Sequence, residues 1–527
     1  MPSYHKTDWR VRLETWMVHN APRVTIMTIW IVSQIVYFIY NLITIGNASN
    51  LVFARSIMGH SLLVSRSAAN LINLNCGIIL FTVCRNIITY LRRTILNRAI
   101  PFDSNIDFHI CVGWAIVFWT YIHVCGHYVN YLNIANSISF KVTPMFIAWQ
   151  TGPGATGQIM VVILFLMVTS AMNNVRRKYF EIFWFTHHLF VIFFGGILMH
   201  GSFCFIKADD VPNAVDRCRG GPQFWKFWVG SAVVYLIERM VREYRGRQIT
   251  YISKVVQHPS KVVEVQIKKP SCKPLPGQYC FICCPEIALY EWHPFTLTSS
   301  PYEDFISMHI RVSGDWTTAF AKRLGCQFDK GDEQNSRVTS LPFVMIDGPY
   351  GTASEDSFKH EVAVLVAAGI GVTPFASILK TIWYRINHPT EQIRLRKVYF
   401  IWICRDKAAF EWFQDLLAVL EEESIDGFLE IHTYLTGGLK LEDVNNIMIN
   451  DQAGQKDAIT RLKSPTYFGR PNWDQLFRGW CADHSGSDVG VFLCGPLALA
   501  NVVSAHCTKY SDGSADGVRF FFDKENF

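Results

Sequence analysis

The sequence predicts a helical membrane domain followed by two soluble domains, an antiparallel β-barrel and a doubly wound α/β domain. Three observations support this fold class. Up to residue 247, long apolar runs separate short basic clusters. After it, short alternating runs are bounded by Pro and Gly, and later still strand-like runs alternate with helical ones. We therefore expect three domains, over residues 1–247, 248–356 and 357–527.

Charge is unevenly divided along the 527 residues, of which 50% are hydrophobic and 17% charged. The first 247 residues carry 22 Lys and Arg against 10 Asp and Glu, whereas the remainder carries 27 against 33. The basic residues of the first part stand at the ends of apolar runs, as is typical of a membrane protein. The composition therefore argues for a lipid bilayer and against nucleic acid as a partner.

Six apolar runs are long enough to cross a bilayer as helices. They lie near residues 24–46, 68–91, 109–132, 157–174, 180–203 and 224–242. Basic clusters follow the second, fourth and sixth runs, and another lies in the N-terminal tail. The positive-inside rule then places both termini in the cytosol, so that the third and fifth helices both run outward. The polar, basic start of the chain does not resemble a cleavable signal peptide.

Two of these predicted helices carry histidines at matched depths. His109 and His123 are 14 residues apart in the third run, and His187 and His200 are 13 apart in the fifth. Each pair would span roughly 20 Å of helix, and an ionisable side chain in hydrocarbon indicates a functional site. The four imidazoles are thus candidate axial ligands of two stacked haem irons. The alternative is that they are interhelical hydrogen-bonding histidines.

The two pairs do not fit an ideal helix equally well. A spacing of 14 residues leaves His109 and His123 about 40° apart, whereas 13 residues leave His187 and His200 about 140° apart. We expect a local distortion at Gly195-Gly196 to correct the second pair. His188 is an alternative ligand, but its spacing to His200 is no better.

Two features bear on the face opposite the cytosol. Asn47 begins a short glycosylation sequon that would lie outside, a weak signal by itself. Cys204 and Cys218 flank a polar loop and would form a disulfide only if that loop lies outside the cytosol.

The predicted barrel contains residues that suit a flavin. Its run Trp292–Ser300 sets hydroxyl groups beside a Pro-fixed backbone, and a strand arginine and a Gly/Thr turn follow. Arginine charge and exposed N–H groups would bind a pyrophosphate. The alternative is an ordinary barrel hairpin. The candidate FAD-binding residues are His293, Pro294, Phe295, Thr296, Ser299, His309, Arg311, Trp316 and Thr317.

Three motifs at predicted strand ends indicate a dinucleotide site. A Gly-rich turn begins at Gly369 and would let a pyrophosphate approach the next helix. Arg405, at the end of a second strand, would bind a 2′-phosphate and select NADPH; the alternative is a solvated surface charge. The third motif contains Cys494, which is otherwise a core thiol. The candidate NADPH-binding residues are Gly369, Gly371, Val372, Thr373, Pro374, Cys404, Arg405, Cys494, Gly495 and Pro496.

Over nearly its whole length the chain resembles the phagocyte-type catalytic subunits of the NADPH oxidase family. The runs that carry this resemblance are Leu74–Cys76, Val83–Asn86, Thr186–Phe194, His293–Ser300, Asp347–Gly351, Gly369–Ser377, Phe410–Phe413, Gly469–Trp473 and Lys524–Phe527. The resemblance implies a ferredoxin-reductase-like module and an electron path from cytosolic NADPH through FAD and two b-type haems to O2, giving superoxide on the opposite face. A flavin suits the middle of this path, because nicotinamide gives a hydride and haem iron accepts single electrons. A plasma-membrane ferric reductase with the same cofactors is the alternative function.

The resemblance also implies roles for individual residues in the membrane. His109 and His187 would hold the inner haem, on the cytosolic side. His123 and His200 would hold the outer one. All four belong to the third and fifth predicted helices.

Arg66 and His127 match the family's candidate oxygen-reduction site, where they would stabilise nascent superoxide. The alternative role of Arg66 is as a haem-propionate partner. Phe527 would cover the flavin ring. The resemblance further implies a plasma or internal membrane, a small membrane partner subunit, cytosolic activating factors and a Rac-type small GTPase. No EF-hand loop precedes the spans, so a calcium-triggered oxidase is not expected.

Overall fold

The computed structural model describes residues 9–138, 141–203, 224–328, 340–388, 394–423, 427–438, 456–457, 459–513 and 517–525. The chain divides into two compact units. One comprises Pro22–Arg239, and the other comprises Met240–Phe527 together with Met1–Ala21. Two long helices, one near each end of the first unit, continue from one unit into the other.

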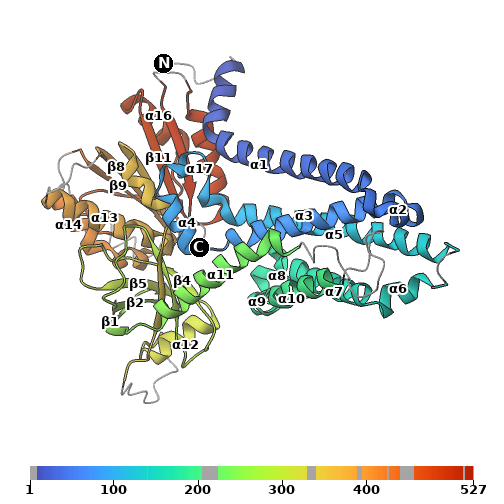
Figure 1. Cartoon of the computed structure of the whole chain (residues 1–527). Helices are drawn as coiled ribbons and strands as arrows, with labels where there is room; N and C mark the ends of the chain where they lie inside the picture. Colours follow the sequence, from blue (N-terminus) through green and yellow to red (C-terminus); the bar gives the residue numbers. More distant parts are fainter. Residues whose placement is uncertain are drawn as a thin grey trace. The chain divides into compact units, whose positions relative to one another are not determined.

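The first unit is built from long helices joined by short ones (Figure 1). The long helices are α1 (Trp9–Gly46), α3 (His60–Phe81), α5 (Asn105–Ala135), α7 (Gly152–Ala171), α10 (Phe190–Ser202) and α11 (Trp225–Gly246), and the shorter α9 (Phe180–His187) directly precedes α10. The short ones are α2 (Val52–Met58), α4 (Arg85–Arg92), α6 (Pro144–Gln150) and α8 (Asn173–Lys178). Many large apolar side chains on these helices are exposed, which suits a lipid environment better than water.

Five segments of the described chain are long and apolar enough to cross a membrane. They are Leu13–Gly46, His60–Phe81, Phe102–Ala135, Gly152–Ala171 and Phe180–Ser202. They correspond to the first five predicted spans, although the second ends at Phe81 and not near residue 91. The sixth predicted span is the helix α11, but charged residues such as Glu238 and Arg239 keep its described part outside this set. Six spans therefore stay a prediction.

The fifth span is interrupted by a turn at His188-Leu189, between α9 and α10. The expected distortion at Gly195-Gly196 is not found, because both glycines lie inside α10. The turn instead lies between His187 and His200, which a continuous ideal helix would keep on different faces.

Helices α3 and α5 pack closely at a glycine. A Cβ atom on Gly126 would lie 2.9 Å from the Cβ of Ser65, so only glycine permits this approach. A buried cluster from several helices forms the centre of the unit: Cys76, Val112, Ile116, Ile163, Leu164, Phe193, Ile197 and Trp228. This packing sets the depth at which the histidines of α5 face those of α9 and α10.

In the second unit, the region predicted as a barrel forms two three-stranded antiparallel sheets. Their strands are β1 (Tyr251–His258), β2 (Val262–Lys268), β3 (Tyr279–Cys283), β4 (His293–Thr296), β5 (Ile306–Arg311) and β6 (Met345–Tyr350). The sheet orders are β1-β2-β5 and β4-β3-β6, and one bridge between Leu297 and Met308 joins them. The antiparallel strands were expected, but a single closed barrel is not seen in the described pairings. The helix α12 (Asp315–Arg323) packs its buried Phe320 on the same core.

The rest of this unit is a six-stranded parallel sheet with helices on both faces. Its strands are β7 (Val362–Ala368), β8 (Lys397–Cys404), β9 (Leu429–Leu435), β10 (Thr466–Phe468), β11 (Asp488–Cys494) and β12 (Arg519–Lys524). The main helices are α13 (Thr373–Asn387), α14 (Gln414–Glu423), α16 (Trp473–Asp483) and α17 (Leu497–Tyr510), with short 3-10 segments at η4 (Ala353–Lys359), η5 (Gly369–Val372) and η6 (Lys407–Trp412).

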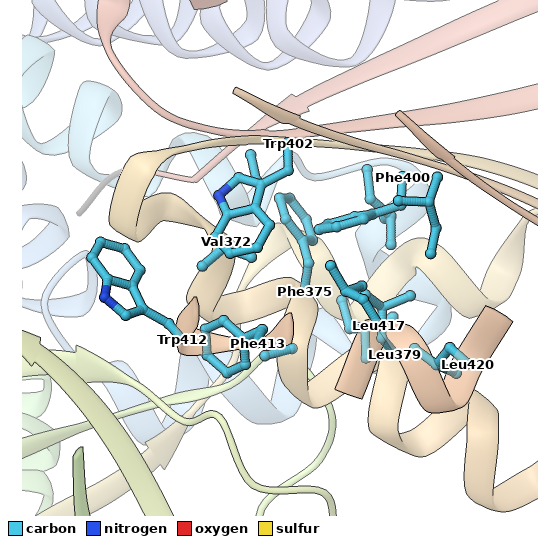
Figure 2. Packing of buried hydrophobic residues seen from close by; sticks show 14 of the residues in the cluster. Val372, Phe375, Leu379, Phe400, Trp402, Trp412, Phe413, Leu417 and Leu420 are labelled. Atoms are coloured by element: carbon cyan, nitrogen blue, oxygen red, sulfur yellow. The ribbon is translucent and has the colours of Figure 1, made fainter. Parts of the chain in front are cut away.

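Each face of this sheet has its own hydrophobic core. Figure 2 shows one, in which Phe400 and Trp402 of β8 pack on Phe375 and Leu379 of α13. The other contains Phe477 of α16 and residues of α17. The nearly continuous apolar run of β7 is what a strand covered on both faces requires. The predicted doubly wound arrangement is therefore present.

Across the sheet the strand order is β10-β9-β8-β7-β11-β12. The strands are all parallel, but their order along the chain reverses between β7 and β11. In open parallel sheets, ligands bind beyond the carboxyl ends of the strands at such a point. Gly369 follows β7 there, and Cys494 ends β11, directly paired with Ala367. The sheet thus brings two of the predicted dinucleotide motifs to one edge.

Candidate functional site

Two pairs of imidazole rings face each other in the membrane unit. The ring centroids of His109 on α5 and His187 on α9 are 6.3 Å apart, and those of His123 on α5 and His200 on α10 are 6.2 Å apart. Two imidazoles on opposite sides of one metal ion have ring centres about 6 Å apart, since each metal–nitrogen bond is about 2 Å long. Both pairs have the spacing that axial ligation of an iron requires.

Three of the four rings are held at Nδ1, which leaves Nε2 available to a metal. The partners are Thr82 Oγ1 for His109 at 2.8 Å, the carbonyl oxygen of Ser65 for His123 at 2.9 Å, and Thr156 Oγ1 for His200 at 3.0 Å. Hydrogen bonds at the second ring nitrogen commonly orient histidine ligands. Each of these three hydrogen bonds joins two helices, as the interhelical alternative requires, and each leaves the Nε2 atom of the ring available to a metal.

The fourth residue, His187, is half-buried, and its buried Nδ1 atom makes no hydrogen bond in the described part of the chain. The neighbouring His188 differs: it is exposed, and its Nδ1 lies 2.7 Å from the carbonyl oxygen of Trp184. The alternative ligand is thus not directed at His109.

Arg66 and His127 lie beside the second histidine pair. The rings of His127 and His123 are 4.5 Å apart, and Asn130 approaches His127 Nδ1 at 3.4 Å. Arg66 lies close enough to His127 for their charges to interact. Within the described residues it makes no hydrogen bond or ion pair. A partly buried guanidinium without a counter-ion can stabilise an anion that forms near it.

Several of the predicted flavin residues meet at the start of α12. The ring of Trp316 lies 4.2 Å from that of His293 and 6.2 Å from that of Phe295. Thr317 Oγ1 accepts the N–H groups of Ser313 and Gly314, at 3.1 and 3.0 Å. Pro294 and Thr296 lie on the same strand as His293, and the exposed Arg311 ends β5. The N-terminus of a helix and an exposed arginine side chain both bind phosphate groups. The start of α12 and Arg311 therefore suit a pyrophosphate.

Two predicted flavin residues have side chains that are engaged elsewhere. Ser299 Oγ accepts the N–H of Ser307 at 3.1 Å. The Nδ1 of His309 lies 3.0 Å from Thr298 Oγ1, and burial lowers the pKa of His309 to about 3. Its imidazole is therefore neutral at pH 7. The last predicted flavin residue, Phe527, lies outside the described residues, as do both cysteines of the predicted disulfide, Cys204 and Cys218.

The Gly-rich turn after β7 is pressed against the end of β11. A Cβ atom on Gly371 would lie 2.2 Å from the carbonyl oxygen of Cys494. Gly369 has φ +56°, and its carbonyl accepts Trp402 Nε1–H at 3.1 Å. Val372, Thr373 and Pro374 then lead into α13. The Gly-rich turn therefore contacts the end of β11, at Cys494, and strand β8, at Trp402. These are the two strands whose ends carry the other predicted NADPH motifs.

The remaining predicted NADPH residues flank this turn. Arg405 is exposed directly after β8, while Cys404 is buried and its pKa is raised by burial. Burial likewise raises the pKa of Cys494 to about 12, so both thiols are protonated at pH 7. A Cβ atom on Gly495 would lie 2.9 Å from the Cβ of Ala368. Pro496 caps α17.

Two polar arrangements around these sites were missed from the sequence. Asp347 is 3% exposed and pairs with Arg242 at 2.8 Å and Arg245 at 2.5 Å. Near the C-terminus, Glu525 Oε1 accepts the N–H of Ser354 at 2.7 Å. Each arrangement joins segments that are far apart in the sequence. From the sequence, only the family-like runs Asp347–Gly351 and Lys524–Phe527 could have indicated that these residues matter.

Three known families match successive parts of the chain. Residues 68–198 match the "Ferric reductase like transmembrane component", residues 248–354 the "FAD-binding domain", and residues 360–508 the "Ferric reductase NAD binding domain". With the apolar helices and the parallel sheet described above, these matches define an integral membrane oxidoreductase that binds FAD and a nicotinamide dinucleotide.

Three curated relatives show which family within this class of membrane oxidoreductases the chain resembles. The chain is 39% identical to a superoxide-generating NADPH oxidase heavy chain of Dictyostelium discoideum, over 98% of both chains. It is 37% identical to NADPH oxidase 1 of Mus musculus, over 100% of this chain and 96% of the relative. It is 35% identical to NADPH oxidase 3 of Homo sapiens, over 97% and 99%. The chain belongs to the NADPH oxidase family.

Proposed function

We propose that this chain moves electrons from cytosolic NADPH through FAD and two b-type haems to O2, producing superoxide on the opposite face of the membrane. The observation that carries the proposal is the pair of facing imidazole couples, at 6.3 and 6.2 Å, on helices apolar enough to span a bilayer. Bound haem would supply one-electron redox chemistry in a region where protein side chains cannot.

In this proposal each histidine pair holds one haem. His109 and His187 bind the haem nearer the cytosol, and His123 and His200 bind the other. The Nδ1 hydrogen bonds of three of these rings fix their orientation and leave Nε2 toward the iron. With a histidine from the protein on each side of a bound haem, the acceptor would be reduced beside the haem and not on its iron.

Arg66 and His127 are proposed to stabilise superoxide as it forms. The guanidinium of Arg66 lies next to the outer pair, close enough to act electrostatically on His127, and its positive charge would favour a nearby negative charge. Arg66 and His127 would suit O2 better than a bulky iron chelate as the acceptor. The same Arg66 would otherwise bind a haem propionate, as noted from the sequence.

The soluble unit is proposed to bind the two nucleotides at the positions found above. FAD would lie along His293, Phe295, Trp316 and Thr317, with Arg311 at its pyrophosphate. NADPH would enter the edge of the parallel sheet, where the turn at Gly371 leads into the N-terminus of α13 and the exposed Arg405 would bind the 2′-phosphate.

Finer features belong to the same proposal. We infer six membrane spans with both termini in the cytosol, an antiparallel barrel-like flavin domain, and domain boundaries at residues 247 and 356. O2 would be the acceptor. A small membrane subunit, cytosolic activating factors and a Rac-type GTPase would be the regulatory partners, by analogy with the phagocyte-type branch of the family.

A second candidate, a ferric reductase, is favoured by one observation: two of the three matching families are named after ferric reductases. Both functions use the same cofactors, so the acceptor distinguishes them. Membranes containing the chain, with cytosol added as a source of activators, should reduce external cytochrome c in an NADPH-dependent manner that superoxide dismutase abolishes.

The same preparation should show a reduced-minus-oxidised haem spectrum and one flavin per chain. Reduction of a ferric chelate that exceeds cytochrome c reduction and resists superoxide dismutase would favour the ferric reductase. Absence of haem absorbance from purified, folded protein would overturn both functions.

A further inference from the structure

Three ligand-type side chains meet on one face of the sheet β1-β2-β5, apart from the histidine pairs of the membrane unit. His258, Glu264 and His309 each direct one nitrogen or oxygen atom to the same place, and these atoms all lie within 4.8 Å of one another. We propose that these three residues bind a divalent transition-metal ion of the zinc type.

The backbone itself brings the three residues together. Glu264 on β2 is paired directly with His309 on β5. His258 ends β1, where it is paired with Val262, two residues before Glu264. Directly opposed residues have Cβ atoms about 5 Å apart, and diagonal neighbours are still within reach of long side chains. The convergence therefore follows from strand register and not from a chance rotamer of an exposed loop.

The distances suit one ion. His258 Nε2 lies 3.2 Å from Glu264 Oε2, and His309 Nε2 lies 3.8 Å from the same oxygen. A tetrahedral zinc ion with bonds of about 2 Å holds its donor atoms roughly 3.3 Å apart. Small side-chain movements would bring the three donor atoms to the distances that a zinc ion requires. The donors are two imidazoles and one carboxylate, a known combination for zinc that leaves a fourth position open.

Two of the atoms not aimed at the proposed ion, one on His309 and one on Glu264, are held by further hydrogen bonds. The Nδ1 of His309 lies 3.0 Å from Thr298 Oγ1, and Thr298 Oγ1 lies 2.7 Å from Ser307 Oγ. Gln266 Nε2 donates to Glu264 Oε1 at 2.9 Å. Outer contacts of this kind orient metal ligands and fix the histidine tautomer. A cluster of ligands already positioned in this way loses little freedom when a cation binds.

A simpler account is a carboxylate that pairs with histidines and binds nothing else. The contact of Glu430 with His432, at 2.8 Å, is such a pair elsewhere in the same unit. It differs because no third ligand joins it among the described residues. It is also more open, since the Glu430 side chain is 45% exposed, whereas the side chains of Glu264 and His309 are 15% and 5% exposed.

The proposed site lies where the flavin and nucleotide regions meet. The ring of Phe413, labelled in Figure 2, is 4.5 Å from the ring of His309. Trp412 Nε1 donates to the carbonyl oxygen of Pro259, next to His258, at 2.9 Å. A bound cation would stiffen the sheet at this boundary, so metal occupancy should affect how firmly the two regions hold together.

Zinc binding to the purified full-length protein tests the proposal without reference to oxidase activity. Protein in detergent is first stripped with a chelator and then titrated with zinc chloride against a chromogenic zinc indicator. We expect one tight site in the unmodified protein that is lost in Glu264→Gln and retained in the matched control His432→Gln. Equal zinc binding by all three proteins would overturn the proposal.

Because His309 is also a predicted flavin residue, flavin and haem contents are measured for every variant. If Glu264→Gln fails to fold, two variants of Thr298 test the proposed zinc site instead. Loss of the orienting hydroxyl in Thr298→Val should weaken zinc binding by about 10- to 100-fold, whereas Thr298→Ser should restore it. Identical zinc affinities for these two variants would rule the site out. An X-ray absorption spectrum with only nitrogen and oxygen donors at about 2 Å is expected for the bound ion.

Discussion

Gly371 and Cys494 stand so close that no side chain fits between them: a Cβ atom on Gly371 would lie 2.2 Å from the carbonyl oxygen of Cys494. The first residue follows β7 and the second ends β11, the two strands between which the sheet order reverses. The contact therefore lies at the place where we propose that NADPH binds, between the carboxyl ends of β7 and β11. Any side chain at Gly371 must push the Gly-rich turn away from the sheet.

Gly371→Ala should therefore impair NADPH use more than folding. A displacement of about 1 Å at a binding turn can cost about 100-fold in kcat/KM, and we expect a loss of that order for NADPH oxidation. Gly479→Ala is the matched control, since nothing lies within 4 Å of a Cβ there. Steady-state kinetics with flavin content measured in parallel make the test. Unchanged kcat/KM in Gly371→Ala would show that NADPH binds elsewhere.

Arg405 gives a separate test of the same site. If its guanidinium binds the 2′-phosphate, Arg405→Ala removes a charge-assisted hydrogen bond worth about 1.5–3 kcal/mol. The KM for NADPH should then rise about 10- to 100-fold, while the KM for NADH, which lacks the phosphate, changes little. Arg396→Ala is a suitable control, because Arg396 is 78% exposed at the opposite end of β8. Equal effects on both nucleotides would remove the phosphate role of Arg405.

Much of the architecture could be predicted because it depends on local patterns. Apolar length marked five helices, and the strand–glycine–helix pattern around Gly369 marked the first βα unit of the sheet. The pairing of His109 with His187, and of His123 with His200, also followed from their depths. Periodicity and length are properties of a short segment, so they can be read without knowing what packs against it.

The features that could not be predicted depend on contacts between distant segments. The turn at His188-Leu189 lies between two histidines whose spacing does not suit a continuous helix, and no Gly or Pro marks it. The Glu525–Ser354 hydrogen bond joins residues 171 positions apart. The convergence of Glu264 and His309 depends on strand register. Side-chain type alone gave no signal for any of these contacts.

The adjacent histidines His187 and His188 allow a closely matched test of haem ligation. His187→Leu removes one imidazole of the pair that faces His109, so haem content should fall from two to about one per chain, with loss of the corresponding redox transition. His188→Leu should leave the spectrum unchanged, because His188 is exposed and bonded to Trp184. Optical redox titration of both purified variants is the measurement. Loss of haem in His188→Leu alone would reverse the assignment.

Asp347 provides a test of how the end of α11 is held by the flavin region. Its carboxylate is 3% exposed and pairs with Arg242 and Arg245, and the phenol of Tyr350 donates to it at 2.7 Å. Removing one partner of a buried ion pair typically costs about 3–5 kcal/mol. Asp347→Asn should accordingly lower the temperature at which flavin is released. Asp304→Asn, in an exposed pair with Lys268, should have no measurable effect.

The same carboxylate gives the protein a defined acid sensitivity. Burial alone would raise the pKa of Asp347, but the guanidinium groups of Arg242 and Arg245 hold it below its ordinary value. A carboxylate with a depressed pKa contributes stability above its unfolded pKa of about 3.9 and loses that contribution as the pH falls through its folded pKa. Flavin release should therefore be insensitive to this group between pH 7 and 5 and become easier below about pH 4. Asp347→Asn should lack this acid step; an unchanged step in that variant would assign it to other carboxylates.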